Sequence, residues 1–195
     1  MKSYNQAGQE EWVRQYLNDK RNGFFVDVGA YDGIESSNTY FLEKELDWDG
    51  ICIESNPHFY NKLVSARKSK NINKAVMPYS GYCRFDGINT YPSIINGPNC
   101  VACESLDSIL TELGAPSSID YMSLDIEGHE FEVLENFNFD KWNVNLMTIE
   151  HNLYVWGDKI KNSLYTLLSS KGYKRVVENV NCPQGPYEDW YAKNF

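Results

Sequence analysis

Long apolar runs are missing from this sequence. None of its 195 residues lies in a stretch approaching the ~20 apolar residues that a membrane helix needs. Residues 1–6 also lack the apolar centre of a secretion signal. We therefore expect a cytoplasmic protein with no membrane insertion.

Positive charge is scarce as well, because 18 Lys and Arg residues stand against 27 Asp and Glu residues, for a net charge of −9. The basic run at residues 67–70 is interpreted as an exposed helix end, where cations offset the helix dipole. Since little of the chain is suited to neutralising phosphates, we do not expect nucleic acid as a partner.

The chain also lacks the cysteine pattern of a disulfide framework or of a zinc site. The chain has five cysteines, and the close pair Cys100 and Cys103 has no second pair with which to complete a zinc site. We expect reduced thiols and no disulfide framework. No repeat or linker divides the chain, and 195 residues can bury a substantial core, so we expect one domain over residues 1–195.

Strand and helix patterns alternate along the chain in the manner of an α/β fold with a mostly parallel sheet. A helical segment within residues 1–22 precedes predicted strands at residues 24–28, 50–54, 72–77, 119–124, 146–149, 173–178 and 187–192. Helices are predicted at residues 38–46, 57–64, 105–113 and 159–171, and around Phe131 and Leu134. Residues 78–100 interrupt this order with several Gly, Pro and aromatic residues, and we interpret them as a hairpin plus loop. Its aromatic residues can cover the substrate as a binding loop or can pack across the strands of the hairpin.

A sharp turn follows the first apolar strand. Gly29 and Gly33 allow the backbone to bend there and to lie against a ligand that a larger residue would exclude. Ser36 and Ser37 can then cap the next helix, whose free N–H groups favour an anionic ligand group. Asp27, near the end of a buried strand, needs a partner to offset its desolvation.

Glu54 ends the second strand, where an acid can accept hydrogen bonds from both hydroxyls of a ribose. The spacing from Asp27 through Gly29 to Gly33 differs from the Gly-x-Gly-x-x-Gly pattern of dinucleotide sites. S-adenosylmethionine fits this arrangement better, because it has a ribose and an amino-acid end but no phosphate. The sequence therefore favours S-adenosylmethionine over a nicotinamide cofactor.

The chain resembles the FkbM-type methyltransferase family of S-adenosylmethionine-dependent enzymes, which often tailor sugars and polyketides. The matching segments are residues 4–10, 25–33, 37–39, 48–54, 124–130 and 149–152. The resemblance implies a Rossmann-like class I methyltransferase fold, with a central, mostly parallel seven-stranded sheet, helices on both faces and a C-terminal antiparallel hairpin. The residues expected to bind the cofactor are Asp27, Gly29, Ala30, Tyr31, Gly33, Ser37, Asn38, Glu54, Ser55 and Asp125.

Polar side chains also follow the predicted strands at residues 119–124 and 146–149. Because the carboxyl ends of parallel strands meet at one edge of a sheet, we expect these side chains to face the acceptor. A hydroxyl acceptor must lose its proton as the methyl group transfers, so the candidate catalytic residues are His151, Glu127 and Asp125. His151 has the most suitable ordinary pKa, whereas Glu127 needs its pKa raised.

Asp125, Glu127 and Glu150 can alternatively hold a divalent cation such as Mg²⁺ or Ca²⁺, which would lower the pKa of a bound hydroxyl. This cluster resembles the acid pattern of metal-dependent sugar methyltransferases such as macrocin O-methyltransferase. That group tends to have paired aspartates where this chain has Glu150 and His151. The sequence leaves a protein base and a bound cation as alternatives.

The function predicted from these residues and the resemblance is an O-methyltransferase that acts on a sugar hydroxyl in a glycan, a nucleotide-sugar or a glycosylated metabolite. One alternative is a catalytically silent module that binds S-adenosylmethionine or supports an assembly. A second is an NAD-dependent oxidoreductase, which the glycine spacing disfavours.

Overall fold

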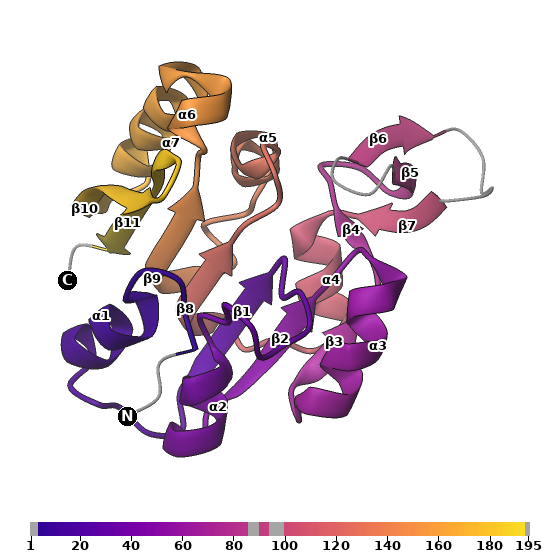
Figure 1. The fold of residues 1–195 in the computed structure, drawn as a ribbon, viewed down its shortest axis with the longest axis horizontal. Helices are drawn as coiled ribbons and strands as arrows, with labels where there is room; N and C mark the ends of the chain where they lie inside the picture. Colours follow the sequence, from indigo (N-terminus) through magenta and orange to yellow (C-terminus); the bar gives the residue numbers. More distant parts are fainter. Residues whose placement is uncertain (1–3, 86–89, 94–99, 194–195) are drawn as a thin grey trace.

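A twisted seven-stranded sheet forms the centre of the computed structural model, which describes residues 4–85, 90–93 and 100–193 (Figure 1). The strands run in the order β10-β11-β9-β8-β1-β2-β3. Their bounds are β1 (Phe24–Val28), β2 (Asp49–Ile53), β3 (Lys70–Ile72), β8 (Ser118–Leu124), β9 (Asn143–Glu150), β10 (Tyr173–Cys182) and β11 (Gly185–Lys193). Neighbouring strands from β3 to β9 pair in parallel, whereas β11 is antiparallel to both β9 and β10. The predicted mostly parallel sheet with a closing hairpin is confirmed.

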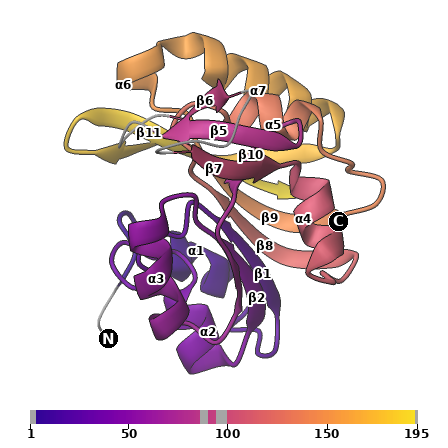
Figure 2. The ribbon, with the colours of Figure 1, turned by 90° about the vertical axis from the view of Figure 1, so that its right-hand side faces the viewer.

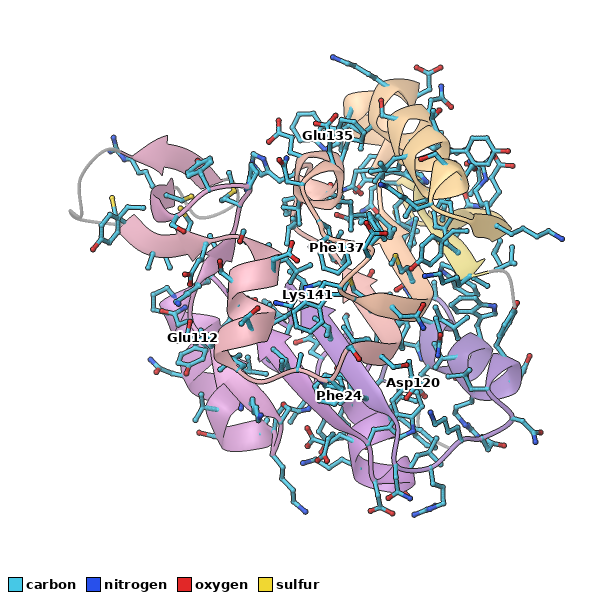
Figure 3. All side chains as sticks on the ribbon, turned by 180° about the vertical axis from the view of Figure 1, so that it is seen from behind. Phe24, Glu112, Asp120, Glu135, Phe137 and Lys141 are labelled. Carbon is cyan, nitrogen blue, oxygen red and sulfur yellow. The ribbon has the colours of Figure 1, made fainter. Side chains whose placement is uncertain are left out.

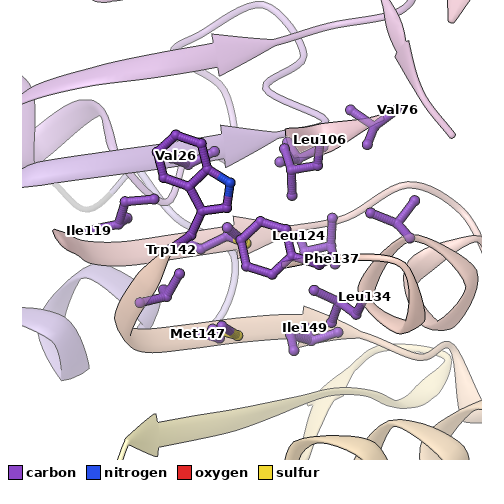
Figure 4. Close-up of a cluster of buried hydrophobic side chains, with 14 of the residues drawn as sticks. Val26, Val76, Leu106, Ile119, Leu124, Leu134, Phe137, Trp142, Met147 and Ile149 are labelled. Atoms are coloured by element: carbon purple, nitrogen blue, oxygen red, sulfur yellow. The ribbon is translucent and has the colours of Figure 1, made fainter. Parts of the chain in front are cut away.

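Helices cover both faces of this sheet (Figures 1 and 2). On one face lie α1 (Gln9–Tyr16), α2 (Tyr40–Leu46) and α3 (Pro57–Ala66), and on the other lie α4 (Leu106–Glu112), α5 (Glu130–Glu135) and α7 (Asp158–Ser170). Alternation along β1 explains the two cores, because Val26 and Val28 face α4, α5 and α7 while Phe25 faces the other helices. Figure 4 shows part of the first core, around Trp142 and Phe137.

The order of strands reverses between β1 and β8. From β1 the chain moves outward through β2 to β3, and it then returns to β8 on the opposite side of β1 before moving to β9. Ligands of open α/β sheets bind beyond the carboxyl ends of the strands at such a reversal. At the opposite end, Asp120 holds β8 beside β1, since its Oδ2 accepts a hydrogen bond from the backbone N–H of Phe24 at 3.0 Å (Figure 3).

The third predicted strand, at residues 72–77, was wrong in extent. The structure divides it into β3 and a separate strand, β4 (Ala75–Val76), which belongs to a different sheet. The side-chain amide of Asn73 explains the division, because it donates to the carbonyl oxygens of Glu54 and Ser55 at 2.7 and 2.9 Å. These bonds direct the chain away from the main sheet after Ile72.

A four-stranded second sheet, in the order β4-β7-β5-β6, contains β5 (Gly81–Phe85), β6 (Thr90–Ser93) and β7 (Cys100–Glu104). The predicted hairpin is present as the antiparallel pair β5 and β6, and β7 is an additional strand. Residues 86–89 and 94–99 and the side chains of Phe85 and Tyr91 lie outside the described part of the chain. The role of residues 78–100 as a substrate loop therefore stays a prediction.

The helices predicted at residues 57–64 and 105–113 are observed as α3 and α4, and each begins at a capping contact. Asn56 Oδ1 accepts from the backbone N–H of His58 at 2.9 Å, and Ser105 Oγ accepts from that of Ser108 at 3.2 Å. Within residues 4–85, 90–93 and 100–193, no helix has the length and apolar content to cross a membrane.

Candidate active site

A cavity of about 500 Å³ opens at the carboxyl ends of β1, β2 and β8, at the strand-order reversal. Every residue predicted to bind the cofactor lines it except Gly33, namely Asp27, Gly29, Ala30, Tyr31, Ser37, Asn38, Glu54, Ser55 and Asp125. Its volume lies within the ~300–1,000 Å³ usual for small-molecule sites. The sequence pattern thus identified residues that share one cavity.

Gly29 allows the first turn to pack directly on the end of β8. Its φ is +88°, and a Cβ atom at this position would lie 1.9 Å from the backbone carbonyl oxygen of Asp125. Its backbone N–H donates to the carbonyl of Ile53 at 2.9 Å, and the N–H of Asp125 donates to Val28 at 3.0 Å. Gly29 therefore fixes the tips of three strands in close contact.

A buried polar network lies beneath this turn, and no local sequence pattern indicated it. Arg67 is 5% exposed and donates through Nε to Glu43 Oε2 at 3.0 Å and through Nη2 to Thr39 Oγ1 at 2.9 Å. The Thr39 hydroxyl in turn donates to Asp27 Oδ2 at 2.5 Å. Burial raises the pKa of Asp27, and the charge of Arg67 and the Thr39 hydrogen bond oppose that increase.

Arg67 also holds the cavity wall, because Nη1 donates to the carbonyl oxygen of Gly33 and to Ser37 Oγ, both at 3.3 Å. Ser37 Oγ accepts from the N–H of Tyr40, the first residue of α2, at 3.1 Å, although Thr39 and not Ser37 occupies the N-cap position. The interpretation of residues 67–70 as an exposed charge run was wrong for Arg67. Its partners come from residues 24 to 34 positions earlier in the chain, so no local pattern indicated its burial.

Glu54 lies at the tip of β2 with both carboxylate oxygens fixed. Oε2 accepts from the backbone N–H of Tyr31 at 2.8 Å, and Oε1 accepts from that of Asn56 at 2.7 Å. Burial raises its pKa to about 7, although these two hydrogen bonds oppose the increase. Because a carboxylate oxygen can accept more than one hydrogen bond, each oxygen retains capacity for a ligand hydroxyl.

Three carboxyl groups come together at the tips of β8 and β9. Asp125, Glu127 and Glu150 each place an oxygen within 4.8 Å of the others. Asp125 and Glu127 line the cavity, whereas Glu150 is only 8% exposed. Burial and the neighbouring Asp125 charge raise the pKa values of Glu150 and Glu127, and burial also raises that of Asp125. The group is poised to hold a shared proton or a cation.

Glu130 is a supporting residue at the start of α5, where its type alone suggests only a favourable interaction with the helix dipole. It is fully buried, and its Oε1 accepts from the backbone N–H groups of Ile126 and Gly128 at 2.9 and 3.2 Å. It thereby shapes the loop that carries Asp125 and Glu127. A glutamate at a helix start is equally suited to an exposed position, so the sequence carried no distinguishing signal.

The structure does not bring His151 into the cavity lining found among the described residues. Its side chain is 1% exposed, and Nε2 lies 3.3 Å from Asp189 Oδ1. Its backbone N–H donates to Tyr187 at 2.7 Å. His129 also lines the cavity, and its Nδ1 lies 3.3 Å from Glu132 Oε2.

Comparison with known proteins agrees with this arrangement. A sequence model of the methyltransferase FkbM domain matches residues 27–175. No protein with a curated description matches the chain.

Solved methyltransferase structures share the fold at low sequence identity. Precorrin-6y C5,15-methyltransferase from Geobacter metallireducens GS-15 has a TM-score of 0.54 and 11% identity, covering 94% of this chain and 87% of that one. For the TehB-like S-adenosylmethionine-dependent methyltransferase from Corynebacterium glutamicum, the TM-score is 0.54 at 7% identity, covering 95% and 88%. Aeropyrum pernix fibrillarin, solved with natively bound S-adenosyl-L-methionine, gives a TM-score of 0.53 at 13% identity, covering 89% and 67%.

Proposed function

Because the chain belongs to the FkbM methyltransferase family, and is thus an S-adenosylmethionine-dependent methyltransferase, we propose that it methylates a hydroxyl group of a sugar. The acceptor would be part of a glycan, a nucleotide-sugar or a glycosylated metabolite. The observation that carries this proposal is the carboxyl cluster of Asp125, Glu127 and Glu150 beside the cofactor cavity. Carboxyl groups can accept hydrogen bonds from several hydroxyls, and one of them can take the proton that the reaction releases.

The cavity residues fit S-adenosylmethionine. Glu54 presents two fixed carboxylate oxygens for the ribose hydroxyls. Asn38 donates through Nδ2 to Ser123 Oγ at 2.9 Å, while its buried Oδ1 has no hydrogen-bond partner among the described residues and suits the ammonium of the amino-acid end. Phe59 and Val76 add apolar surface for the adenine. The bound cofactor supplies an electrophilic methyl group, and the protein's contribution is to hold and orient it.

Glu54→Gln should weaken S-adenosylmethionine binding and remove its dependence on pH near 7. The folded-state pKa of Glu54, about 7, lies above its ordinary 4.5, so the carboxyl group takes up a proton as the pH falls through 7. The neutral form has less acceptor capacity for the ribose hydroxyls, so the affinity of the wild-type protein for S-adenosylmethionine should fall below pH 7. Isothermal titration calorimetry from pH 5.5 to 8.5 measures this effect. A glutamine variant with the wild-type affinity at every pH would remove Glu54 from the ribose site.

We infer that the carboxyl cluster takes up the proton that the acceptor hydroxyl loses during methyl transfer. Glu127 lines the cavity and has a pKa raised by burial and by the Asp125 charge, which makes it a better base near neutral pH than an ordinary glutamate. His151 would have to leave its buried position beside Asp189 to reach the cavity. Glu127 and Asp125 are therefore the preferred catalytic residues.

A divalent cation such as Mg²⁺ fits the same cluster, since three carboxylate oxygens within 4.8 Å of one another are suitable ligands. Such a cation would supply positive charge that lowers the pKa of the acceptor hydroxyl. Glu150 would be its most buried ligand.

A radiolabelled methyl-transfer screen against defined sugars tests the function. Transfer to a sugar is expected, and Glu127→Gln should lower kcat about 100-fold while leaving S-adenosylmethionine affinity unchanged. Glu135→Gln is the matched control, because Glu135 is an exposed glutamate in α5, the helix that follows the loop of Asp125 and Glu127 (Figure 3). Excess chelator should abolish transfer if the cluster holds a cation, so full activity in chelator contradicts the metal assignment. Cofactor binding without transfer to any sugar contradicts the acceptor assignment.

A further inference from the structure

An exposed apolar patch lies next to the carboxyl cluster. The short helix α6 (Leu153–Trp156) follows β9 directly, and it exposes Tyr154, Val155 and Trp156 to 46%, 53% and 46%. Large apolar side chains exposed together usually mark a surface that binds another molecule. We call Tyr154 and Trp156 the α6 platform.

Contacts place α6 against the loop that carries Asp125 and Glu127. A Cβ atom at Gly128 would lie 3.1 Å from the indole Nε1 and Cε2 atoms of Trp156, so the indole packs on the backbone next to Glu127. On the other side, a Cβ atom at Gly185 would lie 3.5 Å from Tyr154 Cβ. The helix therefore sits between the acidic loop and the turn that joins β10 to β11, as Figures 1 and 2 also show.

Two buried acceptors at the base of α6 point to a hydroxyl-bearing ligand. Glu150 and Asn152 are only 8% and 4% exposed. Glu150 Oε2 and Asn152 Oδ1 are buried and have no hydrogen-bond partner among the described residues. Buried acceptors normally have a donor, and a ligand with several hydroxyl groups can supply one. Asn152 is also the residue that precedes α6, at its N-cap position.

An aromatic surface beside a group of carboxylates favours a sugar ring that carries no negative charge. Aromatic faces carry partial negative charge, which suits the weakly positive C–H face of a sugar ring. The hydroxyl rim of the same ring suits carboxylate acceptors. The charges of Asp125 and Glu127 would repel a phosphate or a carboxylate on the ligand.

We propose that Trp156 of the α6 platform forms an acceptor subsite for an uncharged pyranose ring, which stacks on the indole with its hydroxyl groups toward Asp125, Glu127 and Glu150. This inference rests on the proposed function and narrows it. The ring that receives the methyl group is neutral, as in a glycan end or a glycosylated metabolite, and carries no phosphate.

Steady-state kinetics with a neutral methyl glycoside found active in the transfer screen test this subsite. Trp156→Ala should raise KM for the glycoside about tenfold, with kcat and S-adenosylmethionine affinity unchanged, and Trp156→Phe should restore KM. Tyr154→Ala should alter KM less, because Tyr154 lies on the other side of α6, against Gly185. Tyr165→Ala is the matched control, because Tyr165 is 44% exposed on α7 and should leave KM unaltered. The phosphorylated form of the same sugar should react poorly.

Several results separate this inference from the proposed function. If the protein methylates a sugar and Trp156→Ala does not alter KM, or if the phosphorylated sugar is preferred, the subsite is overturned while the function stands. If no sugar is methylated, saturation-transfer NMR with methyl glycosides still tests the subsite, and binding lost in Trp156→Ala but retained in Trp156→Phe supports it. A dimer that Trp156→Ala converts to a monomer in sedimentation would assign the platform to a second copy and overturn the proposal.

Discussion

Gly29→Ala is expected to destabilise the protein by about 3 kcal/mol and to weaken S-adenosylmethionine binding more than tenfold. The new Cβ would lie 1.9 Å from the carbonyl oxygen of Asp125, so the tips of β1 and β8 must separate. The φ of +88° adds strain for any residue with a side chain. Because Asp27, Glu54 and Asp125 line one cavity at these tips, their separation disturbs every predicted cofactor contact.

Gly172→Ala provides a matched control for this substitution. Gly172 has a similar φ of +84°, but a Cβ atom there would meet nothing within 4 Å. This variant should therefore lose only about 1 kcal/mol, the cost of the backbone conformation, and should bind the cofactor normally. Urea denaturation and calorimetry measure both effects. Equal losses in the two variants would show that packing against Asp125 is unimportant.

Arg67→Met should cost about 3–5 kcal/mol of stability, because it leaves Glu43 as a buried charge without its main partner. It also removes donors to Gly33, Ser37 and Thr39, so the cavity wall should loosen and cofactor affinity should fall. Arg21→Met is the control, since the ion pair of Arg21 with Asp47 is more than half exposed at both residues and should contribute less than about 1 kcal/mol.

The same network predicts a pH dependence. Burial alone would raise the pKa of Glu43, but Arg67, Lys44 and the N–H of Lys68 outweigh burial and hold it at about 2, below its ordinary 4.5. Stability from this carboxylate is therefore complete above pH 4.5 and declines as the pH falls toward 2. Arg67→Met should flatten this decline in denaturation measured between pH 2 and 6. Adding Glu43→Gln should restore part of the stability lost in Arg67→Met. If it does not, the unpaired buried charge of Glu43 is not the cause of the loss.

Local patterns were sufficient to predict the parallel sheet and most of the residues that line the cavity at its carboxyl edge. Gly29 and Glu54 could be placed there because turn geometry and strand ends depend on neighbouring residues, whereas Gly33 does not line the cavity. Arg67 could not be predicted in this way, since its partners lie 24 to 34 residues earlier in the chain. Glu130 could not either, because a glutamate at a helix start is equally suited to a buried and to an exposed position. The division between β3 and β4 likewise depends on a side chain, Asn73, that binds the end of another strand.

The two candidate bases show a second limit of sequence patterns. Glu150 and His151 are adjacent at the end of β9, and successive residues of a strand point to opposite faces. Glu150 therefore joins Asp125 and Glu127, while the ring of His151 lies against Asp189. The pattern did not distinguish these two side chains, and which of them faces the acceptor stays a prediction.

A crystal structure of the complex with S-adenosylhomocysteine would locate the donor relative to the four strand tips. We expect a ribose bound to Glu54, an amino-acid end near Asn38, and a sulfur atom facing the cluster of Asp125, Glu127 and Glu150. Electron density for the nucleoside outside this cavity, or a sulfur atom turned away from the three carboxyl groups, would contradict this expectation.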